Sequence, residues 1–283
     1  MSVKDSPLYG TYVKMINERE SIRRKKAAGE PKPWTTDPIL IKYRFCNMRR
    51  MDDKVSLWLL NNWYEPYKDH PNMLYAALVG RFFNLPASLE EITGLVFSDG
   101  DWKYDEICKT LRDRKASKKT IFNNAYMVRG NDGPDKVSTV MEYTIQPMIS
   151  DPPEINTSSM RESWQNLVEC YGMASFMTGQ VVADLRWAMS GSWEDKDTWA
   201  PYGPGSSKGL CRLHDRPLKR DMDQDQFIEE VTELKEFASK DICPVLNSRM
   251  EMMDWQNTLC EFDKYVRVMN GEGRPKQLYP GAC

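Results

Sequence analysis

The sequence predicts a mainly α-helical fold, in which a small pair of β-strands is the most sheet structure that we expect. Two observations lead to this prediction. Apolar residues recur three and four positions apart in most segments, which is the spacing of one helix face. Only residues 120–146 contain the apolar–polar alternation that is typical of strands. The chain has 283 residues, of which 41% are hydrophobic, and this is enough to bury a sizeable core.

We expect the chain to consist of two parts. Residues 1–33 would form an N-terminal basic helix and a linker, because an amphipathic piece at 9–22 passes into a basic run and a proline-containing loop. Residues 34–283 would form a single helical domain. No internal repeat or low-complexity segment interrupts it.

The first half of this domain contains clear helix signals. Asp37 directly before Pro38 predicts a helix start, with Ile39, Tyr43 and Cys46 on one side of the helix. Ser88 with Glu91 has the spacing of a capping box at the start of another helix. Further helices are expected at residues 55–63, 73–83 and 101–119.

The remaining elements are less uniform. Residues 120–128 are the best strand candidate, and residues 136–146 fit either a helix or a second strand. After a break at Asp151-Pro-Pro153, helices are expected in the stretch beginning at Leu167 and at the two segments 223–240 and 245–269.

We expect the rest of the chain to be organised around the stretch from Leu167 to Leu210. A helix is expected from just after Gly172 to about Trp187, and it places Gln180 and Asp184 on one face because they are four residues apart. A polar pair on an otherwise apolar helix needs partners if it is buried.

A second glycine-rich segment follows, which reads Gly203-Pro-Gly205-Ser206-Ser-Lys208-Gly209. We expect a loop whose backbone N–H groups approach an anion closely, with Lys208 adding positive charge. The segment is not a Walker A loop, and that motif is absent from the whole chain. The plain alternative is a core helix followed by an ordinary Gly-Pro loop.

A sharper hypothesis is a helix–hairpin–helix element, in which a glycine hairpin offers backbone amides to a DNA phosphate. Leu167 to Val182 resembles this element of the DNA glycosylases, and Asp197 lies downstream at about the place of their catalytic Asp. Ala174 departs from the pattern, because it stands where a second hairpin glycine is usual.

The composition excludes several classes of protein. The net charge is −2, so a contact with DNA would need local basic clusters. Three basic runs are present, each with a solvated helix face as the alternative explanation: residues 23–26, 49–50 and 112–119. Seven widely spaced cysteines without a Cys-x-x-Cys pair indicate no disulfide framework and a reducing compartment. Two histidines cannot build a His-rich metal site, and no signal peptide or membrane span is recognisable.

Three groups of residues carry a resemblance to one family. The first is Trp34–Leu40 with Tyr43–Arg50, the second is Phe176–Leu185 with Gly203–Leu210, and the third is Cys260–Arg267 with Gly271–Pro275. In this order they resemble the bacteriophage amino acid:DNA transferases, also called alpha-glutamyl/putrescinyl thymine pyrophosphorylases. That family is helical and is related to the helical domain of 5-hydroxymethyluracil DNA kinases and distantly to DNA glycosylases. The resemblance runs from about Trp34 to Gly281, so the first basic helix lies outside it.

The resemblance implies a step of thymidine hypermodification. A kinase first phosphorylates or pyrophosphorylates 5-hydroxymethyluracil in DNA, and the amine of an amino acid, glycine or similar, or of a polyamine then displaces that group. The implied partners are viral double-stranded DNA, the free amine and a 5-hydroxymethyluracil DNA kinase, in the host cytoplasm, where the modification protects phage DNA from restriction. No cofactor is implied with certainty, and the sequence leaves open whether Mg²⁺ bridges the leaving phosphates.

This chemistry selects candidate residues. A base must accept a proton from the incoming ammonium, and Asp197 is the first choice and Asp184 the second. The other candidates would bind DNA or substrate: Arg44, Arg49, Arg50 and Lys208 for phosphate, Asn47 and Gln180 for the uracil edge, Gly203, Gly205 and Ser206 for an anion, and Lys264, Arg267 and Arg274 as a second basic patch.

Each candidate has a structural alternative. For Lys264 and Arg267 we favour ion pairs with Glu261 and Asp263, which lie within one helical turn. For Cys46, which could add to the uracil ring, we favour a buried structural thiol. Two other functions stay open for the whole chain: a helix–hairpin–helix glycosylase and a non-catalytic DNA-binding module.

Overall fold

The computed structural model of the chain describes residues 2–123, 134–275 and 278–279. These residues belong to two compact units. Unit 1 comprises Met1–Asp53 and Lys196–Cys283, and unit 2 comprises Lys54–Asp195. The chain passes from one unit to the other after Asp53 and again after Asp195, so the boundary expected at residue 33 coincides with neither point. The expectation of one domain over residues 34–283 stays a prediction, because compact units can belong to one folding domain.

The mainly helical prediction is confirmed. The described residues contain no β-sheet, and an isolated antiparallel bridge joins Tyr43 to Leu278. The helix cores follow from the apolar spacing that the sequence displays, because buried side chains recur on one face of each long helix.

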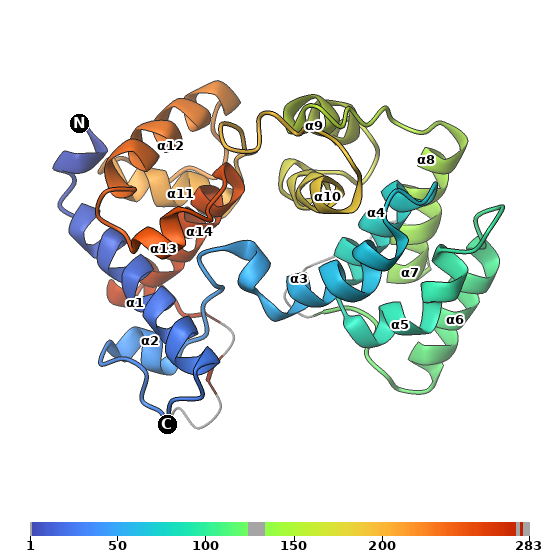
Figure 1. Cartoon of the computed structure of the whole chain (residues 1–283), viewed down its shortest axis with the longest axis horizontal. Helices are drawn as coiled ribbons and strands as arrows, with labels where there is room; N and C mark the ends of the chain where they lie inside the picture. The colour runs from blue at the N-terminus through green and yellow to red at the C-terminus, as the bar shows by residue number, and fades with distance from the viewer. Residues whose placement is uncertain (1, 124–133, 276–277, 280–283) are drawn as a thin grey trace. The chain divides into compact units, whose positions relative to one another are not determined.

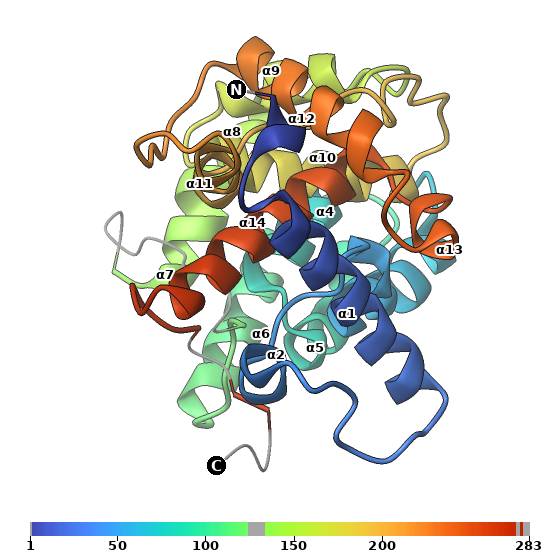
Figure 2. The ribbon, with the colours of Figure 1, turned by 90° about the vertical axis from the view of Figure 1, so that its left-hand side faces the viewer.

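Unit 1 is built around two long helices, α1 and α14, which lie side by side in Figure 2. The hydroxyl groups of Tyr12 on α1 and Thr258 on α14 form a hydrogen bond of 2.6 Å. The Tyr12 ring packs edge to face against the Phe262 ring. The helical segments of unit 1 are: η1 (Val3–Asp5), α1 (Tyr9–Ala27), α2 (Pro38–Lys42), η2 (Arg50–Asp52), α11 (Pro204–Leu213), α12 (Gln224–Ala238), α13 (Pro244–Asn247) and α14 (Met252–Met269).

The glycine-rich segment expected as a loop is a helix. Gly203 is the N-cap residue of α11, Pro204 occupies the first helical position, and the segment through Gly209 is helical. A Cβ atom on Gly205 would lie 3.0 Å from Cys260 Sγ, and one on Gly209 would overlap the carbonyl oxygen of Leu259. The glycines therefore serve the close packing of α11 on α14, which the loop prediction missed.

Unit 2 surrounds the buried helix α4, whose bounds agree with the expected segment 73–83. Figure 1 shows its helices, which are, with the shorter segments: α3 (Lys54–Trp58), the π-helical η3 (Leu59–Tyr64), η4 (Glu65–Tyr67), α4 (Met73–Phe83), α5 (Pro86–Val96), α6 (Tyr104–Ala116), α7 (Lys136–Ser138), the π-helical η5 (Thr139–Ile145), α8 (Gln146–Ser150), α9 (Met160–Val168) and α10 (Ser175–Ala188).

Two helices flank the glycine turn in the stretch that resembles a helix–hairpin–helix element. Helices α9 and α10 pack on each other and are joined by residues 169–174. Gly172 has φ +81°, and a Cβ there would overlap the side chain of Thr144, so both the backbone and the neighbour require glycine. Ala174 is the N-cap of α10 and supplies no side-chain cap. The turn's role as a phosphate clamp stays a prediction.

Several expected elements differ from the structure. Residues 136–146 are helical, so the helix alternative is confirmed there and the second strand is wrong, and residues 124–128 of the strand candidate 120–128 lie outside the described residues. Ser88 is no cap, because α5 begins at Pro86 and the Ser88 hydroxyl donates to the carbonyl of Ile121. The long helix expected at residues 245–269 is interrupted between α13 and α14. None of the described helices is both long enough and apolar enough to cross a bilayer.

Candidate functional site

The polar segment 43–53 of unit 1 is tied to one face of α14. Glu261 accepts the backbone N–H of Cys46 at 3.0 Å, and Asp254 accepts that of Arg50 at 2.8 Å. Between them, the Asn257 amide donates to the carbonyl oxygen of Asn47 at 2.9 Å. These α14 residues are three and four apart, so one face of the helix meets the hydrogen-bonding groups of the irregular segment.

Asn47 is fully engaged inside this segment. Its side-chain oxygen accepts from Arg19 Nη2 at 2.6 Å, its amide donates to the Asp52 carbonyl, and its backbone N–H donates to Asp53 Oδ1. These bonds shape the segment, and they occupy the groups that were expected to read a uracil edge.

Arg19 of α1 contributes an unused donor to the same place. Its side chain is 7% exposed, and its Nε and Nη2 donate to the carbonyl of Phe45 and to Asn47. Its Nη1 is buried and has no hydrogen-bond partner among the described residues. A buried guanidinium nitrogen without a partner carries a desolvation penalty that an acceptor would relieve.

Among the carboxyl groups of this segment, Asp53 has the most clearly shifted pKa. Burial raises its pKa to about 6, and the charge of Glu261 adds to this effect. The backbone N–H of Asn47 and the charges of Arg19 and Arg50 act in the opposite direction. Asp53 is therefore a stronger base than an ordinary carboxylate and has cations within electrostatic range.

The three arginines predicted in this segment have different surroundings. Arg44 is exposed, and neither it nor the Arg50 guanidinium makes a hydrogen bond or ion pair within the described part of the chain. Arg49 is held by Asp52 at 3.1 Å and by the carbonyl of Arg249. Arg44 and Arg50 are thus available to a ligand.

Lys264 and Cys46 both lie beside Glu261 of α14. Lys264 pairs with Glu261, which raises the Lys264 pKa although burial alone would lower it. Arg267 pairs with Asp263 at 3.3 Å, so the ion pairs favoured from the sequence are present. The residue Cys46 is exposed as a whole, but the charge of Glu261 and then burial of the sulfur raise the pKa of its thiol, which disfavours the reactive thiolate.

The candidates on α11 are placed by helix packing. Ser206 is fully buried, and its hydroxyl donates to the Gly203 carbonyl and accepts from the Gly203 N–H. The Ser206 hydroxyl also accepts a hydrogen bond from the Gln256 side-chain amide at 3.3 Å. Lys208 is half-buried and has no ion pair within the described ranges, so of these residues Lys208 keeps its charge available.

Asp184 and Gln180 lie in the core of unit 2. Arg81 donates to both oxygens of Asp184, and the Tyr64 hydroxyl donates to the same carboxylate at 2.6 Å. Burial raises the pKa of Tyr64, followed by the effect of the Asp184 charge, so the phenol stays protonated as a donor. Asp184 is 2% exposed and links α10, α4 and η3, which is the arrangement of a buried structural ion pair.

Asp197 and Arg274 belong to unit 1. The Asp197 carboxylate is half exposed and pairs with its neighbour Lys196 at 2.7 Å, while its carbonyl accepts from Lys235. Arg274 is exposed. The side chains of Asp197, Arg274 and the 43–53 segment are not joined by any hydrogen bond or ion pair between described residues.

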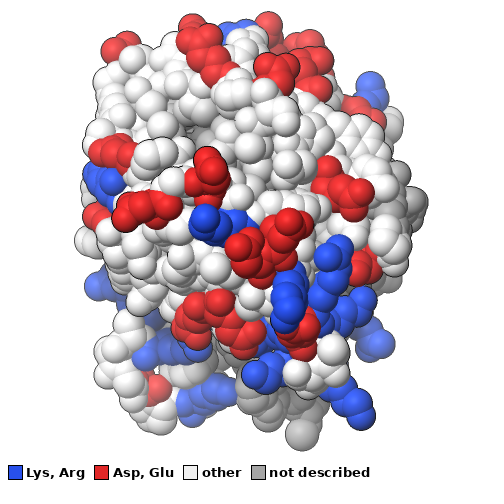
Figure 3. Space-filling model, turned by 90° about the vertical axis from the view of Figure 1, so that its right-hand side faces the viewer, with Lys and Arg blue, Asp and Glu red and all other residues white. Residues whose placement is uncertain are grey.

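The basic run of residues 112–119 is ion-paired in part, because two carboxylates serve three of its five cations. Arg114 and Lys119 both pair with Glu91, and Arg112 pairs with Asp135. Figure 3 shows this face of unit 2, where Lys and Arg gather toward the lower edge and are interleaved with Asp and Glu. A solvated, ion-paired helix face explains this run. Groups of three or more potential metal ligands are absent from the residues that could be searched.

Sequence reasoning missed Asp53 and Arg19. Asp53 looked like one charge in a polar run, and Arg19 looked like one basic residue of an amphipathic helix. The available signal was the density of polar groups between Tyr43 and Asp53, which exceeds what core packing can accommodate. Nothing in the sequence indicated that α1 supplies a buried guanidinium to that segment.

Comparison with known proteins places the chain in a family. The model of "5-hmdU DNA kinase, helical domain" matches residues 6–274, which includes the N-terminal helix that the resemblance had left out. A protein named 5-hmdU DNA kinase from Bacillus phage SP10 is 26% identical over 229 residues. The match covers 72% of this chain and 36% of that relative, so the chain spans about a third of the relative's length. No solved structure matches. Because the family model covers nearly the whole chain, the protein belongs to the family of the 5-hmdU DNA kinase helical domain.

Proposed function

We propose that the protein modifies viral DNA in thymidine hypermodification. In this proposal it binds double-stranded DNA that carries a phosphorylated or pyrophosphorylated 5-hydroxymethyluracil. It then attaches an amino acid, glycine or a similar amine, at the methylene carbon. The family match to a helical domain of 5-hmdU DNA kinases and the resemblance to the amino acid:DNA transferases support it. The chain contains no Walker A motif, so the preceding phosphorylation would come from a P-loop kinase segment or protein.

One observation carries the proposal: a carboxyl group with a raised pKa lies within electrostatic range of two guanidinium groups that have unused donors. The carboxyl group is Asp53, and the guanidinium groups are those of Arg19 and Arg50. Amine transfer needs such a combination. A base must take the ammonium proton before nitrogen can attack, and cations must hold the departing phosphate.

In the proposed step, the amine nitrogen forms a bond to the methylene carbon as the bond between that carbon and the phosphate oxygen breaks. The bonding electrons leave with the (pyro)phosphate, whose charge Arg50 and Arg19 Nη1 would stabilise. Asp53 would receive the proton that the ammonium loses. Asp197, the first choice from the sequence, stays the alternative proton acceptor.

The second candidate function is a non-catalytic helical module that binds DNA beside a kinase. The match to the helical domain of a larger kinase favours it, because that relative extends well beyond the matched part. A glycosylase is the third candidate and rests on the α9–turn–α10 unit and on Asp197.

Nucleoside mass spectrometry separates these functions. The full chain is incubated with a P-loop 5-hydroxymethyluracil kinase, ATP, amino acids and DNA that contains 5-hydroxymethyluracil. New amino-acid adducts on the thymidine derivative support amine transfer, and omission of the kinase serves as the control. Abasic sites would indicate a glycosylase. Retention of DNA without any new nucleoside would leave the binding module as the function.

A further inference from the structure

Asp52 is surrounded by three arginines from three different parts of unit 1. Arg249 Nη2 lies 2.7 Å and Arg49 Nη1 lies 3.1 Å from Asp52 Oδ1, and Arg23 Nε lies 3.3 Å from Oδ2. Arg23 belongs to α1, Arg49 directly precedes η2, and Arg249 follows α13. We call Arg23, Arg49 and Arg249 the arginine cluster.

The cluster carries more positive than negative charge. Arg23 also pairs with Glu20, so three guanidinium groups face two carboxylates. Another arginine group of unit 1 is balanced: Arg212 and Arg267 face two carboxylates, those of Asp263 and Glu272. Cations held a few ångströms apart repel each other, and an added anion would offset this repulsion.

The cluster also keeps donors that point to no partner. In the described structure, no hydrogen bond is made by Arg49 Nη2 or by Nε and Nη1 of Arg249. The Arg249 side chain is 37% exposed, whereas Asp52 is only 9% exposed. The buried Asp52 carboxylate therefore holds one nitrogen of each guanidinium group in place. The donors that make no hydrogen bond remain available to a ligand. Planar guanidinium forks of this kind suit the oxygens of a phosphate.

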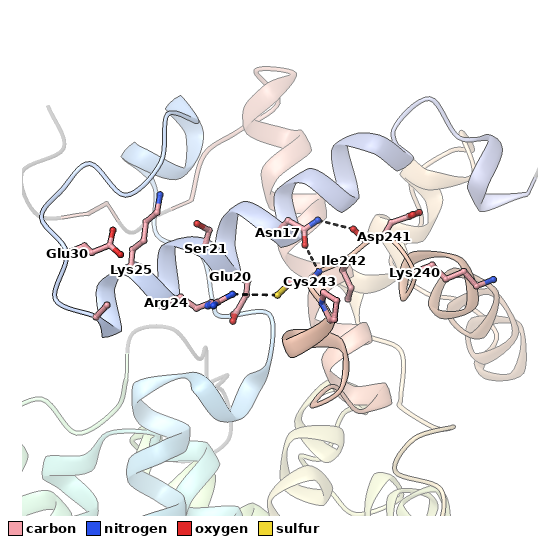
Figure 4. Close-up of a pocket in the computed structure, with 12 residues that line it drawn as sticks. Asn17, Glu20, Ser21, Arg24, Lys25, Glu30, Lys240, Asp241, Ile242 and Cys243 are labelled. Carbon is pink, nitrogen blue, oxygen red and sulfur yellow. Dashed lines mark hydrogen bonds between the residues drawn. The ribbon is translucent and has the colours of Figure 1, made fainter.

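A groove of about 800 Å³ lies along α1 and the residues that precede α13, and the cluster residues themselves do not line it. The Arg23 charge interacts with Glu20 and Cys243, and both of these residues line the groove. Figure 4 shows Asn17 bridging the Asp241 carbonyl and the Cys243 N–H, with the Arg24 side chain extended toward Cys243. Asn17 thus links the two sides of the groove, and Glu20 is the residue that the groove shares with the partners of the cluster.

We propose that the arginine cluster is a phosphate-binding site, and this inference rests on the proposed function for the source of the phosphate. That source is either a phosphodiester of the bound DNA or the (pyro)phosphate that the reaction releases. A purely structural role for all three arginines is disfavoured, because two guanidinium groups would already neutralise Asp52 and Glu20, and the third adds uncompensated charge.

The test uses the full chain and the variant Arg249→Gln. Binding of unmodified double-stranded DNA is measured over a range of salt concentrations, and binding of inorganic pyrophosphate is measured by calorimetry. Arg216→Gln is the matched control, because Arg216 is similarly exposed in the same unit but is held by both oxygens of Glu230.

If the cluster binds a DNA phosphate, Arg249→Gln weakens DNA binding about tenfold and lowers the salt slope by about one. If it binds the leaving group, Arg249→Gln abolishes pyrophosphate binding and leaves the DNA slope unchanged. Arg216→Gln should change neither quantity. Arg249→Lys, which keeps the charge but loses the fork, should give an intermediate loss.

The inference is overturned if Arg249→Gln and Arg49→Gln alter only the unfolding midpoint, with both kinds of binding unchanged. Should Arg249→Gln fail to fold, Arg249→Lys and Arg49→Gln decide the same question. Adduct formation is scored separately by mass spectrometry. Phosphate binding that is unchanged in the cluster variants, together with normal adducts from the wild type, would refute the cluster alone, whereas cluster-dependent binding without adducts would refute amine transfer alone.

Discussion

Gly209 of α11 lies so close to Leu259 of α14 that no side chain fits between the two helices at this point. The obstacle is backbone, because a Cβ atom at position 209 would overlap the Leu259 carbonyl oxygen. We predict that Gly209→Ala destabilises the protein by about 1–3 kcal/mol through overpacking. Denaturant unfolding measures this. Gly10→Ala is the control, because a Cβ at position 10 meets nothing within 4 Å and alanine favours the helix, so this variant should keep or gain stability, and an equal loss in both variants would contradict overpacking.

Asp184→Asn should destabilise unit 2 by about 3–5 kcal/mol, because it leaves the buried Arg81 guanidinium without its anionic partner. Thermal or denaturant unfolding gives the value. Asp113→Asn removes an exposed ion pair with Lys109 and should stay within about 0.5 kcal/mol of the wild type. A stable Asp184→Asn protein that binds DNA but lacks activity would return Asp184 to the list of catalytic candidates.

Asp53→Asn should stabilise the protein at pH 7 and have little effect at pH 4. The folded state raises the pKa of Asp53 from 3.8 to about 6, so ionisation costs more in the folded than in the unfolded chain. Below about pH 4 both states are protonated and no cost arises. Between pH 4 and pH 6 the wild type loses stability on this account, by about 1–3 kcal/mol in total. Unfolding free energies at pH 4, 5, 6 and 7 provide the measurement, and equal differences at all four values would contradict the raised pKa.

The same variant should lose the chemical step. With Asp53 as the base, Asp53→Asn preserves DNA affinity and lowers the single-turnover rate by roughly 10²-fold or more. The wild-type rate should rise with pH through about 6, as the carboxyl group ionises. Asp197→Asn should keep most of the rate. The reverse pattern, with the loss in Asp197→Asn, would transfer the role to Asp197, and full activity in both variants would exclude both carboxylates.

Arg50→Ala and Lys208→Ala should each weaken DNA binding and lower its salt slope by about one phosphate contact. Both cations lack an ion pair in the described structure, so little of their charge is already compensated. Fluorescence anisotropy at several salt concentrations gives the slopes. Lys109→Ala, which removes an exposed and already paired cation, should leave the slope unchanged. Unaltered slopes in both test variants would remove these two residues from the interface.

The sequence by itself determined the helical class, the position of most helices and the ion pairs that lie within one helical turn. α4 at residues 73–83 and the Lys264–Glu261 pair were predictable because they depend on spacing along a single helix. The sequence also marked the segment between Tyr43 and Asp53 as too polar for ordinary packing.

Only the tertiary structure decided which residues meet across that segment. Arg19 and Glu261 are 242 positions apart in the numbering, yet both contact residues 45–47, and this pairing leaves no periodic signal in the sequence. The glycines of α11 were misread for the same reason. Gly205 and Gly209 in isolation indicate a loop, whereas glycine is required at both positions because α14 packs directly against them. Local propensity is set by neighbours along the chain, but burial and close helix contact are set by neighbours in space, and these override it.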